Sequence, residues 1–371
     1  MTHAVGFTRG LGVVVAEFLG EQDRDRSSAA DLAADLASGA TAVSRALTGT
    51  TASRTLVRRG FLLRKLYADV VGADGDVLVV QLAWLRVAGV HTPYAVVERY
   101  PADGGREVLR GRPIAGSPRR RRDGGMEYSI ATRDGRTLRL VHHSPVPAWH
   151  PSDPQISPRV HWHVAVPYAR AEVSWAGAGA GSCLGAGAGL GDGVGSGAGV
   201  GSGAGPLVGT GYADWVWLRL PPRLLGLRRL RWGRVHLPDR TVVFTSVDQT
   251  NGMRWTRLAE WRVGGGQGDP AGGVSGEPVE VVVDGAPRVD GPDADSGTWT
   301  VPAPGGPVML EPLRVLHEGE PLDTDRFPDP LERWGSRLAS GATYEIRLLS
   351  KARDETGATG MAVHESIRFG H

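Results

Sequence analysis

From about residue 61 onward, apolar and polar positions follow the two-residue period that is typical of β-strands. The apolar runs at 66–71 and 77–85 are separated by Gly72-Ala-Asp-Gly75, which is a turn signal. In Tyr344-Glu-Ile-Arg-Leu the alternation is complete, so one face of this strand is apolar. Further strand candidates are residues 91–100, 128–131, 137–141, 212–220, 230–236, 241–247, 279–284, 298–301, 308–316 and 361–369.

The spacing of these segments predicts an all-β protein. Strands that recur every 8–12 residues or so, with turn signals and no helical patterns between them, are typical of antiparallel barrels and sandwiches. A glycine-rich stretch interrupts the series, and the strand pattern resumes after it. We therefore expect a first β-domain over residues 56–205, ending in a glycine-rich insertion at 176–205, and a second over residues 206–371.

The glycine-rich stretch does not encode a phosphate-binding loop. Between residues 177 and 211 glycine occupies only odd-numbered positions, whereas G-x-G-x-x-G needs a step of three. We interpret the stretch as a flexible insertion and expect its cysteine, Cys183, to have no functional role. A second glycine-rich segment at 264–276 is expected to form a loop.

The first 55 residues have a different pattern. Ser28-Ala-Ala-Asp31 is a candidate capping box. The alanine-rich stretch after it places apolar residues on a narrow helical stripe, at Leu32, Leu36, Val43 and Leu47. We expect a short N-terminal helical extension that lies on the body of the protein.

The composition excludes several classes of protein. Hydrophobic residues make up 41% of the chain and charged residues 22%, which is typical of a soluble globular protein. A formal net charge of +2 is too small to indicate nucleic-acid binding. The chain has no apolar run long enough for a transmembrane helix, and its single cysteine excludes an internal disulfide. We expect a cytoplasmic protein.

Two segments carry candidate chemistry, and the first is Val160-His-Trp-His-Val. On a strand His161 and His163 share one face, while Trp162 shares the other face with the valines. A pair of histidines can ligate a metal, with a third ligand from elsewhere such as His142, His143 or His150. Because the chain has one cysteine and a single H-x-H pair, we expect no metal. A solvated strand face and a polar site inside a barrel remain as interpretations.

The second segment is Gly211-Tyr-Ala-Asp-Trp-Val-Trp217. Alternation places Tyr212 and Asp214 on one face of the strand, and Trp215 and Trp217 on the other. Burial of Asp214 among aromatic residues would raise its pKa, because desolvation disfavours the anion. A protonated carboxylic acid is what an acid catalyst needs. The alternative is a structural aspartate held by backbone amides.

Arginines cluster around Leu230 and Trp232, at positions 228, 229, 231 and 234. Two interpretations remain open for this cluster. It forms a basic strand edge, or it forms a lip that touches anionic lipid at the inner face of the membrane.

The order of these motifs resembles that of a known family. The motifs are His161-Trp-His163, Pro167-Tyr-Ala-Arg170 with Glu172 and Val173, Gly211-Tyr-Ala-Asp214 with Trp217, Trp232-Gly-Arg234, Thr241-Val-Val-Phe244 and Ala362-Val-His-Glu-Ser-Ile367, preceded by Leu66-Tyr-Ala-Asp69 and Pro93-Tyr-Ala95. Together they resemble the carotenoid 1,2-hydratase (hydroxyneurosporene synthase) family over roughly residues 60–371. The resemblance implies two tandem lipocalin-like antiparallel β-barrels that share an apolar cavity.

The resemblance also implies an activity: cofactor-free addition of water to a terminal double bond of an acyclic carotenoid or related isoprenoid. On this basis Asp214 is the expected acid, with Trp162 and Tyr212 stabilising the cation. His161 or His163 is expected to position or deprotonate the water. The expected substrate-binding residues are Trp217, Trp215 and Tyr168.

The chain departs from the family's Gly-Tyr-His-Asp-His-Asn-Trp-Gly motif. Ala213 and Trp215 stand where the family has histidines, and Val216 and Leu218 replace asparagine and glycine. The acid is retained and its polar neighbours are lost, which favours a drier site. Two alternatives to hydration follow: an isoprenoid or polyketide cyclase or isomerase of the same fold, and a non-catalytic carrier of a lipid or pigment.

Overall fold

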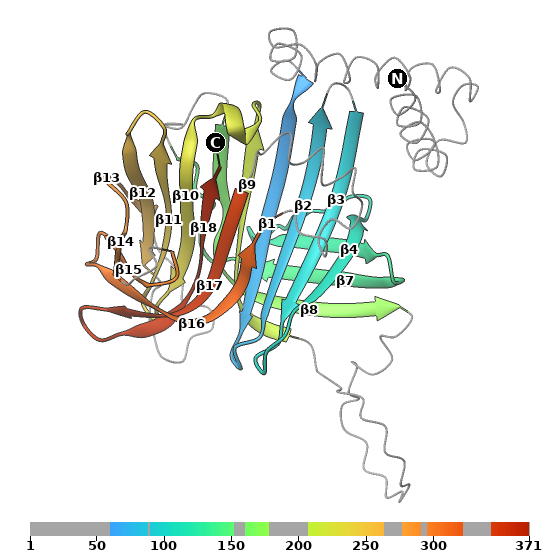
Figure 1. Cartoon of the computed structure of the whole chain (residues 1–371). Coiled ribbons are helices and arrows are strands. Elements are labelled where there is room, and N and C mark those ends of the chain that lie inside the picture. The colour runs from blue at the N-terminus through green and yellow to red at the C-terminus, as the bar shows by residue number, and fades with distance from the viewer. Residues whose placement is uncertain are drawn as a thin grey trace, which may run out of the picture.

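The computed structural model describes residues 60–87, 90–151, 160–177, 207–262, 277–290, 295–321 and 343–370. Two antiparallel β-sheets lie side by side (Figure 1). Between residues 61 and 370 the described regular structure is β, apart from a short 3-10 turn, η2 (Pro222–Leu224). The predicted all-β class is therefore confirmed. The expected helical extension over residues 1–55, Cys183 and the loop at 264–276 lie outside the described residues.

The first sheet closes into a barrel. Its strands are β1 (Leu62–Gly72), β2 (Val77–Val87), β3 (Val90–Tyr100), β4 (Glu107–Pro113), β5 (Arg119–Arg120), β6 (Met126–Thr132), β7 (Arg136–His143), β8 (Val160–Gly177) and β9 (Leu207–Leu218). They follow the order β4-β3-β2-β1-β9-β8-β7-β6-β5, and an additional pairing of β4 with β6 closes the ring. Gly111 lies at this closure, where a β-carbon would collide with the Ala131 carbonyl. Glycine therefore permits the close approach of β4 and β6.

The second sheet is curled, and its described strands do not close. The strands are β10 (Leu227–His236), β11 (Arg240–Gln249), β12 (Arg254–Arg262), β13 (Val279–Asp284), β14 (Arg288–Asp290), β15 (Thr298–Val301), β16 (Val308–Gly319), β17 (Thr343–Asp354) and β18 (Thr359–Phe369). Their order is β13-β12-β11-β10-β18-β17-β16-β15-β14. The two halves thus repeat one antiparallel plan, with sequential strands neighbouring one another and the last strand beside the first.

Strand β9 belongs to the first barrel, although the predicted domain boundary assigns it to the second domain. The sequence pattern divides the chain at 205/206, which assigns residues 207–218 to the second domain. In the structure β9 pairs along its length with β1 and β8 of the first sheet. The glycine-rich segment therefore connects two adjacent strands of one barrel, and the second sheet begins at β10.

Each half has its own apolar core, and a third core lies between them. The residues of this shared core come from both sheets: Tyr67, Val71, Val77, Val79, Tyr100, Val146, Trp149, Val164 and Tyr212 from the first, and Val243, Ala259, Trp261, Leu316, Leu349 and Val363 from the second. We call this region the inter-sheet core. Both sheets contribute one face to it, and buried polar and charged residues lie among the apolar ones.

Two buried ion pairs cross the inter-sheet core. The Nε of Arg234 lies 2.9 Å from an Asp69 oxygen, and Nη1 of Arg347 lies 2.9 Å from Oε2 of Glu98. All four side chains have no exposed surface. A buried charge without its partner is strongly unfavourable. Both pairs form only when the two sheets pack in this arrangement, so they disfavour other arrangements of the sheets.

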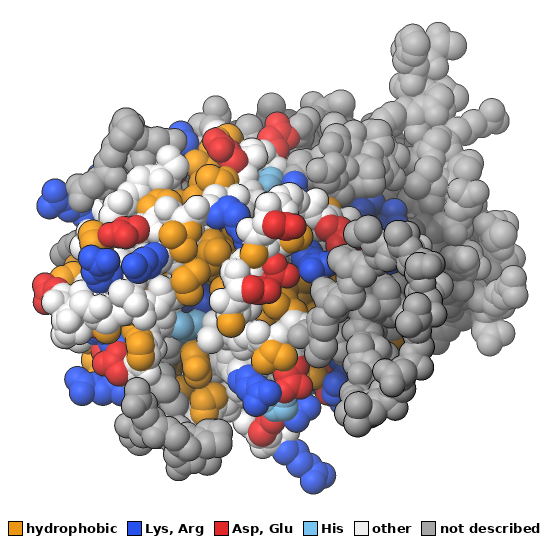
Figure 2. Space-filling view, turned by 90° about the horizontal axis from the view of Figure 1, so that it is seen from below, with side chains coloured by type: hydrophobic (Ala, Val, Ile, Leu, Met, Phe, Trp, Pro, Cys, Tyr) orange, Lys and Arg blue, Asp and Glu red, His pale blue; other side chains and the backbone are white. Residues whose placement is uncertain are grey.

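Among the described residues, no helix has the length and apolar character that a membrane crossing requires. Acidic, basic and hydrophobic side chains are intermixed on the lower end of the molecule (Figure 2).

Candidate functional site

The Asp214 carboxyl lies in the inter-sheet core and accepts two hydrogen bonds on one oxygen. The Tyr212 hydroxyl donates to Oδ2 over 2.9 Å, and the Trp162 indole N–H donates to the same oxygen over 3.1 Å. Tyr212 reaches it because residues two apart on β9 share a face. Trp162 reaches it from β8, as the strand spacing predicts. The side chain of Asp214 is almost fully buried, with 5% of its surface exposed.

Burial raises the pKa of Asp214 from 3.8 to about 6. The hydrogen bonds from Trp162 and Tyr212 act in the opposite direction, because they stabilise the anion. The positive charge of Lys65 on β1 also lowers this pKa, and the negative charge of Glu365 on β18 raises it. The carboxyl therefore exchanges its proton near neutral pH, which is the property that an acid catalyst requires.

Aromatic rings from both sheets surround this carboxyl. The ring of Trp232 on β10 stacks on Tyr212, with centroids 5.8 Å apart and planes 19° apart. The same indole meets Tyr67 on β1 edge to face at 4.6 Å. On the other side, Trp149 meets Trp162 edge to face at 5.3 Å. The acid therefore lies among π-faces, which attract a nearby cation.

Further polar groups come to the site from elements distant in the sequence. Tyr67 is the β1 partner of Asp214, and Gln81 on β2 is the partner of Tyr67. Gln81 shares the face of Val77 and Val79, which line the inter-sheet core. Its buried amide nitrogen has no hydrogen-bond partner among the described residues. Gln81, Tyr67 and Asp214 therefore form one row of polar side chains across three strands.

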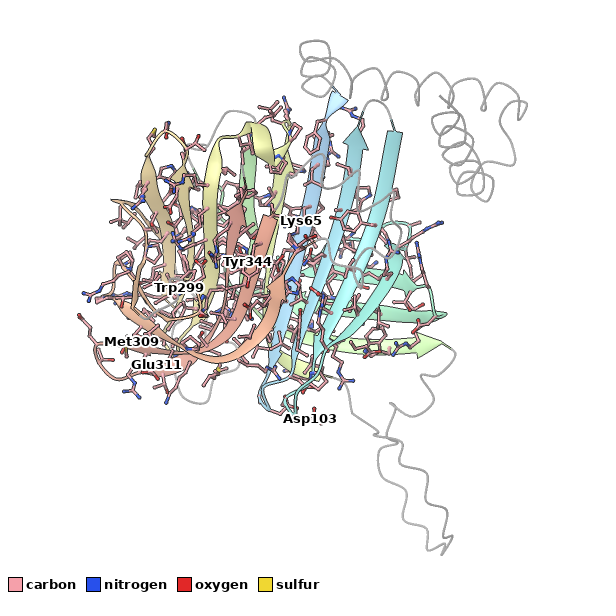
Figure 3. The ribbon with its side chains drawn as sticks, viewed as in Figure 1. Lys65, Asp103, Trp299, Met309, Glu311 and Tyr344 are labelled. Carbon is pink, nitrogen blue, oxygen red and sulfur yellow. The ribbon has the colours of Figure 1, made fainter. Side chains whose placement is uncertain are left out.

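A charged group borders this row. Lys65 extends from β1 at the junction of the two sheets (Figure 3), and its charge acts on both Asp214 and Glu365. Glu365 itself accepts a hydrogen bond from Nε of Arg347 over 2.9 Å. Sequence patterning misses Gln81, Lys65 and Glu365, because only the pairing of distant strands and the packing of the two sheets bring them to Asp214.

Four of the other predicted site residues lie away from Asp214: His161, His163, Trp215 and Trp217. The His163 ring lies on the opposite face of β8, stacked on His150 at 4.5 Å and on Trp217 at 5.5 Å. Trp215 also lies on that opposite side, stacked on Trp84 at 5.9 Å and packed against the core of the first barrel. Alternation of side chains along paired strands explains this separation.

His161 lies away from the acid, whereas Tyr168 lies at the inter-sheet core. His161 is exposed to solvent. Tyr168 packs against the inter-sheet core, where its ring meets His236 edge to face at 5.0 Å. Two β8 register shifts lie between Val164 and Ala169, so that residues on either side of them do not keep one alternation.

The acid therefore lies between the two sheets. Asp214 and Tyr212 point out of the first barrel, toward the second sheet. Burial persists because the second sheet covers this face. The predicted rise in the pKa of Asp214 has the predicted cause, desolvation.

Searches against family models and against curated protein sequences give no match to the chain. Several solved structures are similar in fold. A candidate AttH protein from Nitrosomonas europaea superposes with a TM-score of 0.48 at 12% identity, over 83% of this chain and 92% of its own. CghA, solved with Sch210972, gives 0.45 at 12% identity over 84% and 90%, and kievitone hydratase from Nectria haematococca gives 0.44 at 9% over 87% and 93%. At these identities the likeness assigns no residue roles, and the family resemblance of the sequence stays a prediction.

Proposed function

We propose that the protein is an acid catalyst that adds water to a carbon–carbon double bond of an apolar isoprenoid. The observation that carries this proposal is the Asp214 carboxyl, buried between two hydrogen-bond donors, with its pKa raised to about 6. Both donors act on Oδ2, so the proton of the neutral acid belongs on Oδ1. An acyclic carotenoid is the substrate that the sequence resemblance favours.

The reaction begins when the O–H of Asp214 adds its proton to the less substituted alkene carbon. The C=C π bond breaks, a C–H bond forms and a tertiary cation remains. The Trp162 and Tyr212 donors, together with Lys65, stabilise the carboxylate that is left behind. The π-face of Trp232 offers stabilisation to the cation.

Water then attacks the cation and forms the C–O bond, and the oxonium proton returns to the Asp214 carboxylate. The product is a tertiary alcohol, and the acid is regenerated. The unpartnered Gln81 amide in the same row supports hydration over cyclisation, because a buried amide of this kind can hold a water. Cyclisation or isomerisation follows the same first step and ends without water.

Replacement of Asp214 by Asn tests the acid. The amide retains an acceptor oxygen for Trp162 and Tyr212 but cannot supply the proton. Turnover of an acyclic polyene should fall by about 10²-fold or more, with little change in binding. Turnover that survives in Asp214→Asn would refute the assignment. Asp134→Asn, on an exposed turn, is the matched control and should retain activity.

The pH profile separates a chemical role from a structural one. Turnover in the wild type should require the protonated acid and fall tenfold per pH unit above about pH 6. In Tyr212→Phe one donor to the anion is lost, so the midpoint should move to higher pH. A midpoint that stays in place would show that the carboxyl of Asp214 does not donate the proton.

A non-catalytic carrier of an apolar ligand is the second candidate. The low exposure of Asp214 favours it, because a structural carboxyl has no need to meet a substrate. Saturable binding of a polyene to the wild type, without conversion after prolonged incubation, would identify a carrier.

A further inference from the structure

A second polar cluster lies on the other side of the second sheet from Asp214. Arg231 on β10 pairs with Ser246 on β11 and with Ser366 on β18, so the three side chains form a row. In the next row His364 neighbours Gly233. This face also carries Phe244 and the core of the second sheet, whereas Trp232 and Glu365, one residue away, face the inter-sheet core.

Three groups in this cluster have a buried polar atom without a partner among the described residues. They are the hydroxyl of Ser246, Nε of Arg231 and Nδ1 of His364. Ser246 and His364 have no exposed surface, and Arg231 has 5%. By contrast, the neighbouring Ser366 hydroxyl donates to Asp295 over 2.8 Å. Buried polar groups are nearly always hydrogen-bonded, so three such atoms on one face indicate that another molecule completes them.

The free atoms are donors. Oγ of Ser350 lies 2.8 Å from Nε2 of His364. Burial lowers the pKa of His364 to about 3, so the ring is neutral and carries one N–H. When Ser350 donates to Nε2, that N–H is on Nδ1, and it joins the N–H of Arg231 and the O–H of Ser246. These three donors suit an anion, and Oδ1 of Asp248 is a buried acceptor on the same sheet face that also lacks a partner among the described residues.

The charges around the cluster also favour a monovalent anion. Asp295 forms ion pairs with Arg368 at 2.6 Å and with Arg229 at 3.6 Å. Asp248 lies 3.4 Å from Nη1 of Arg231. In these ion pairs three guanidinium groups contact two carboxylates, so basic groups outnumber acidic ones. The contact with Asp248 uses Nη1 and leaves Nε of Arg231 available.

An aromatic wall borders the donors. The ring of Trp299 (Figure 3) lies 4.5 Å from the ring of His364 and 6.3 Å from that of Phe244. Its centroid is 6.0 Å from Cζ of Arg231. We propose that the inner face of the second sheet binds a small organic carboxylate, which accepts from Arg231, Ser246 and His364 and rests its apolar end on Trp299 and Phe244. This site is separate from the Asp214 site.

Benzoate and acetate are suitable probes, titrated at constant ionic strength with chloride as the balancing salt. Samples are equilibrated overnight, because the groups are buried. Saturable binding by calorimetry, together with a shift of the 15N resonance of His364 Nδ1, is expected for the wild type. Benzoate should bind more tightly than acetate, since only benzoate has a ring to place on Trp299.

Two serine variants form a matched pair, since both serines flank Arg231 in one row. Ser246→Ala should weaken benzoate binding by about fivefold or more, the effect of one lost donor. Ser366→Ala should leave the affinity within twofold, because Asp295 already holds that hydroxyl. Ser246→Thr retains the hydroxyl and should retain binding, which separates loss of the donor from loss of the fold.

The proposal is overturned if the wild type shows no saturable binding. It is also overturned if Ser366→Ala weakens binding as much as Ser246→Ala does. Asp214→Asn should bind benzoate like the wild type, so the outcome is independent of the proposed catalytic activity. Loss of benzoate binding in Asp214→Asn would assign the anion to the inter-sheet core and refute the second site.

Discussion

Replacing Asp214 by Asn should make the protein more stable at neutral pH and not at acid pH. The folded-state pKa of Asp214 is about 6, against 3.8 for an unperturbed carboxyl. Between these values the folded state holds a proton that the unfolded state has released. The unfolded state binds fewer protons there, so the free energy of unfolding falls as the pH rises through this window.

The size of the change in unfolding free energy follows from the raised pKa of Asp214. A difference of about two pKa units corresponds to about 3 kcal/mol of stability, which is fully present below about pH 4 and lost above about pH 6. Asn carries no charge, and its amide oxygen can accept from Tyr212 and Trp162 in place of Oδ2. The unfolding free energy of Asp214→Asn, minus that of the wild type, should therefore increase by about 1–3 kcal/mol from pH 4 to pH 7.

The assay is urea unfolding of both proteins at each pH unit from 4 to 8. The control is Asp134→Asn. Hydrogen bonds from Thr132 and Arg136 lower the pKa of Asp134 below its usual value. Its charged form is stabilised in the folded state, and this contribution is already in place above the usual carboxyl pKa of 3.8. The control should therefore differ from the wild type by a nearly constant amount from pH 5 to pH 8. Parallel stability curves for Asp214→Asn and the wild type would refute the assignment of a raised pKa to Asp214.

Three further predictions concern packing and the seating of the two sheets. Arg234→Met should lower the free energy of unfolding by about 3–5 kcal/mol in a denaturant titration, because it leaves the Asp69 carboxylate buried and unpaired. The double variant with Asp69→Leu should recover most of this stability. A double variant as unstable as the single one would contradict the reasoning. Gly211→Ala should cost about 1–3 kcal/mol, since its β-carbon would lie 2.7 Å from the His142 ring and 2.8 Å from the Ala171 β-carbon; unchanged thermal unfolding would show that the ring moves freely. Deleting residues 181–203 should leave the melting temperature within a few degrees, because β8 and β9 pair through their own ladder; loss of soluble expression would show that the segment is structural.

Much of the fold follows from local pattern. Period-2 alternation is a property of neighbouring residues, so it predicts both the strands and the faces that their side chains share. That is why Tyr212 and Asp214 are expected together on β9, and why Trp162 is expected on the face opposite His161 and His163. The same patterns predict an antiparallel all-β chain in two parts.

Strands β4, β5, β12 and β14 are absent from this prediction. In the segment Arg254–Arg262 the two terminal arginines are exposed, but Arg257 and Glu260 lie among buried positions. Ion pairs such as that of Arg240 with Glu260 make those polar positions compatible with burial. Such pairs form between distant segments, so the local pattern does not reveal the strand.

The sequence by itself determined which residues could act as an acid and which share its strand face, because both depend on residue type and on spacing along one strand. Only the tertiary structure decided which compartment that face meets. Burial of Asp214 comes from the second sheet. Gln81 and Lys65 reach it through strand pairings between segments that lie far apart in the chain, and Trp232 and Glu365 reach it through packing of the second sheet on the first. Long-range pairing and packing depend on the whole fold, and a single sequence does not encode them in any local window.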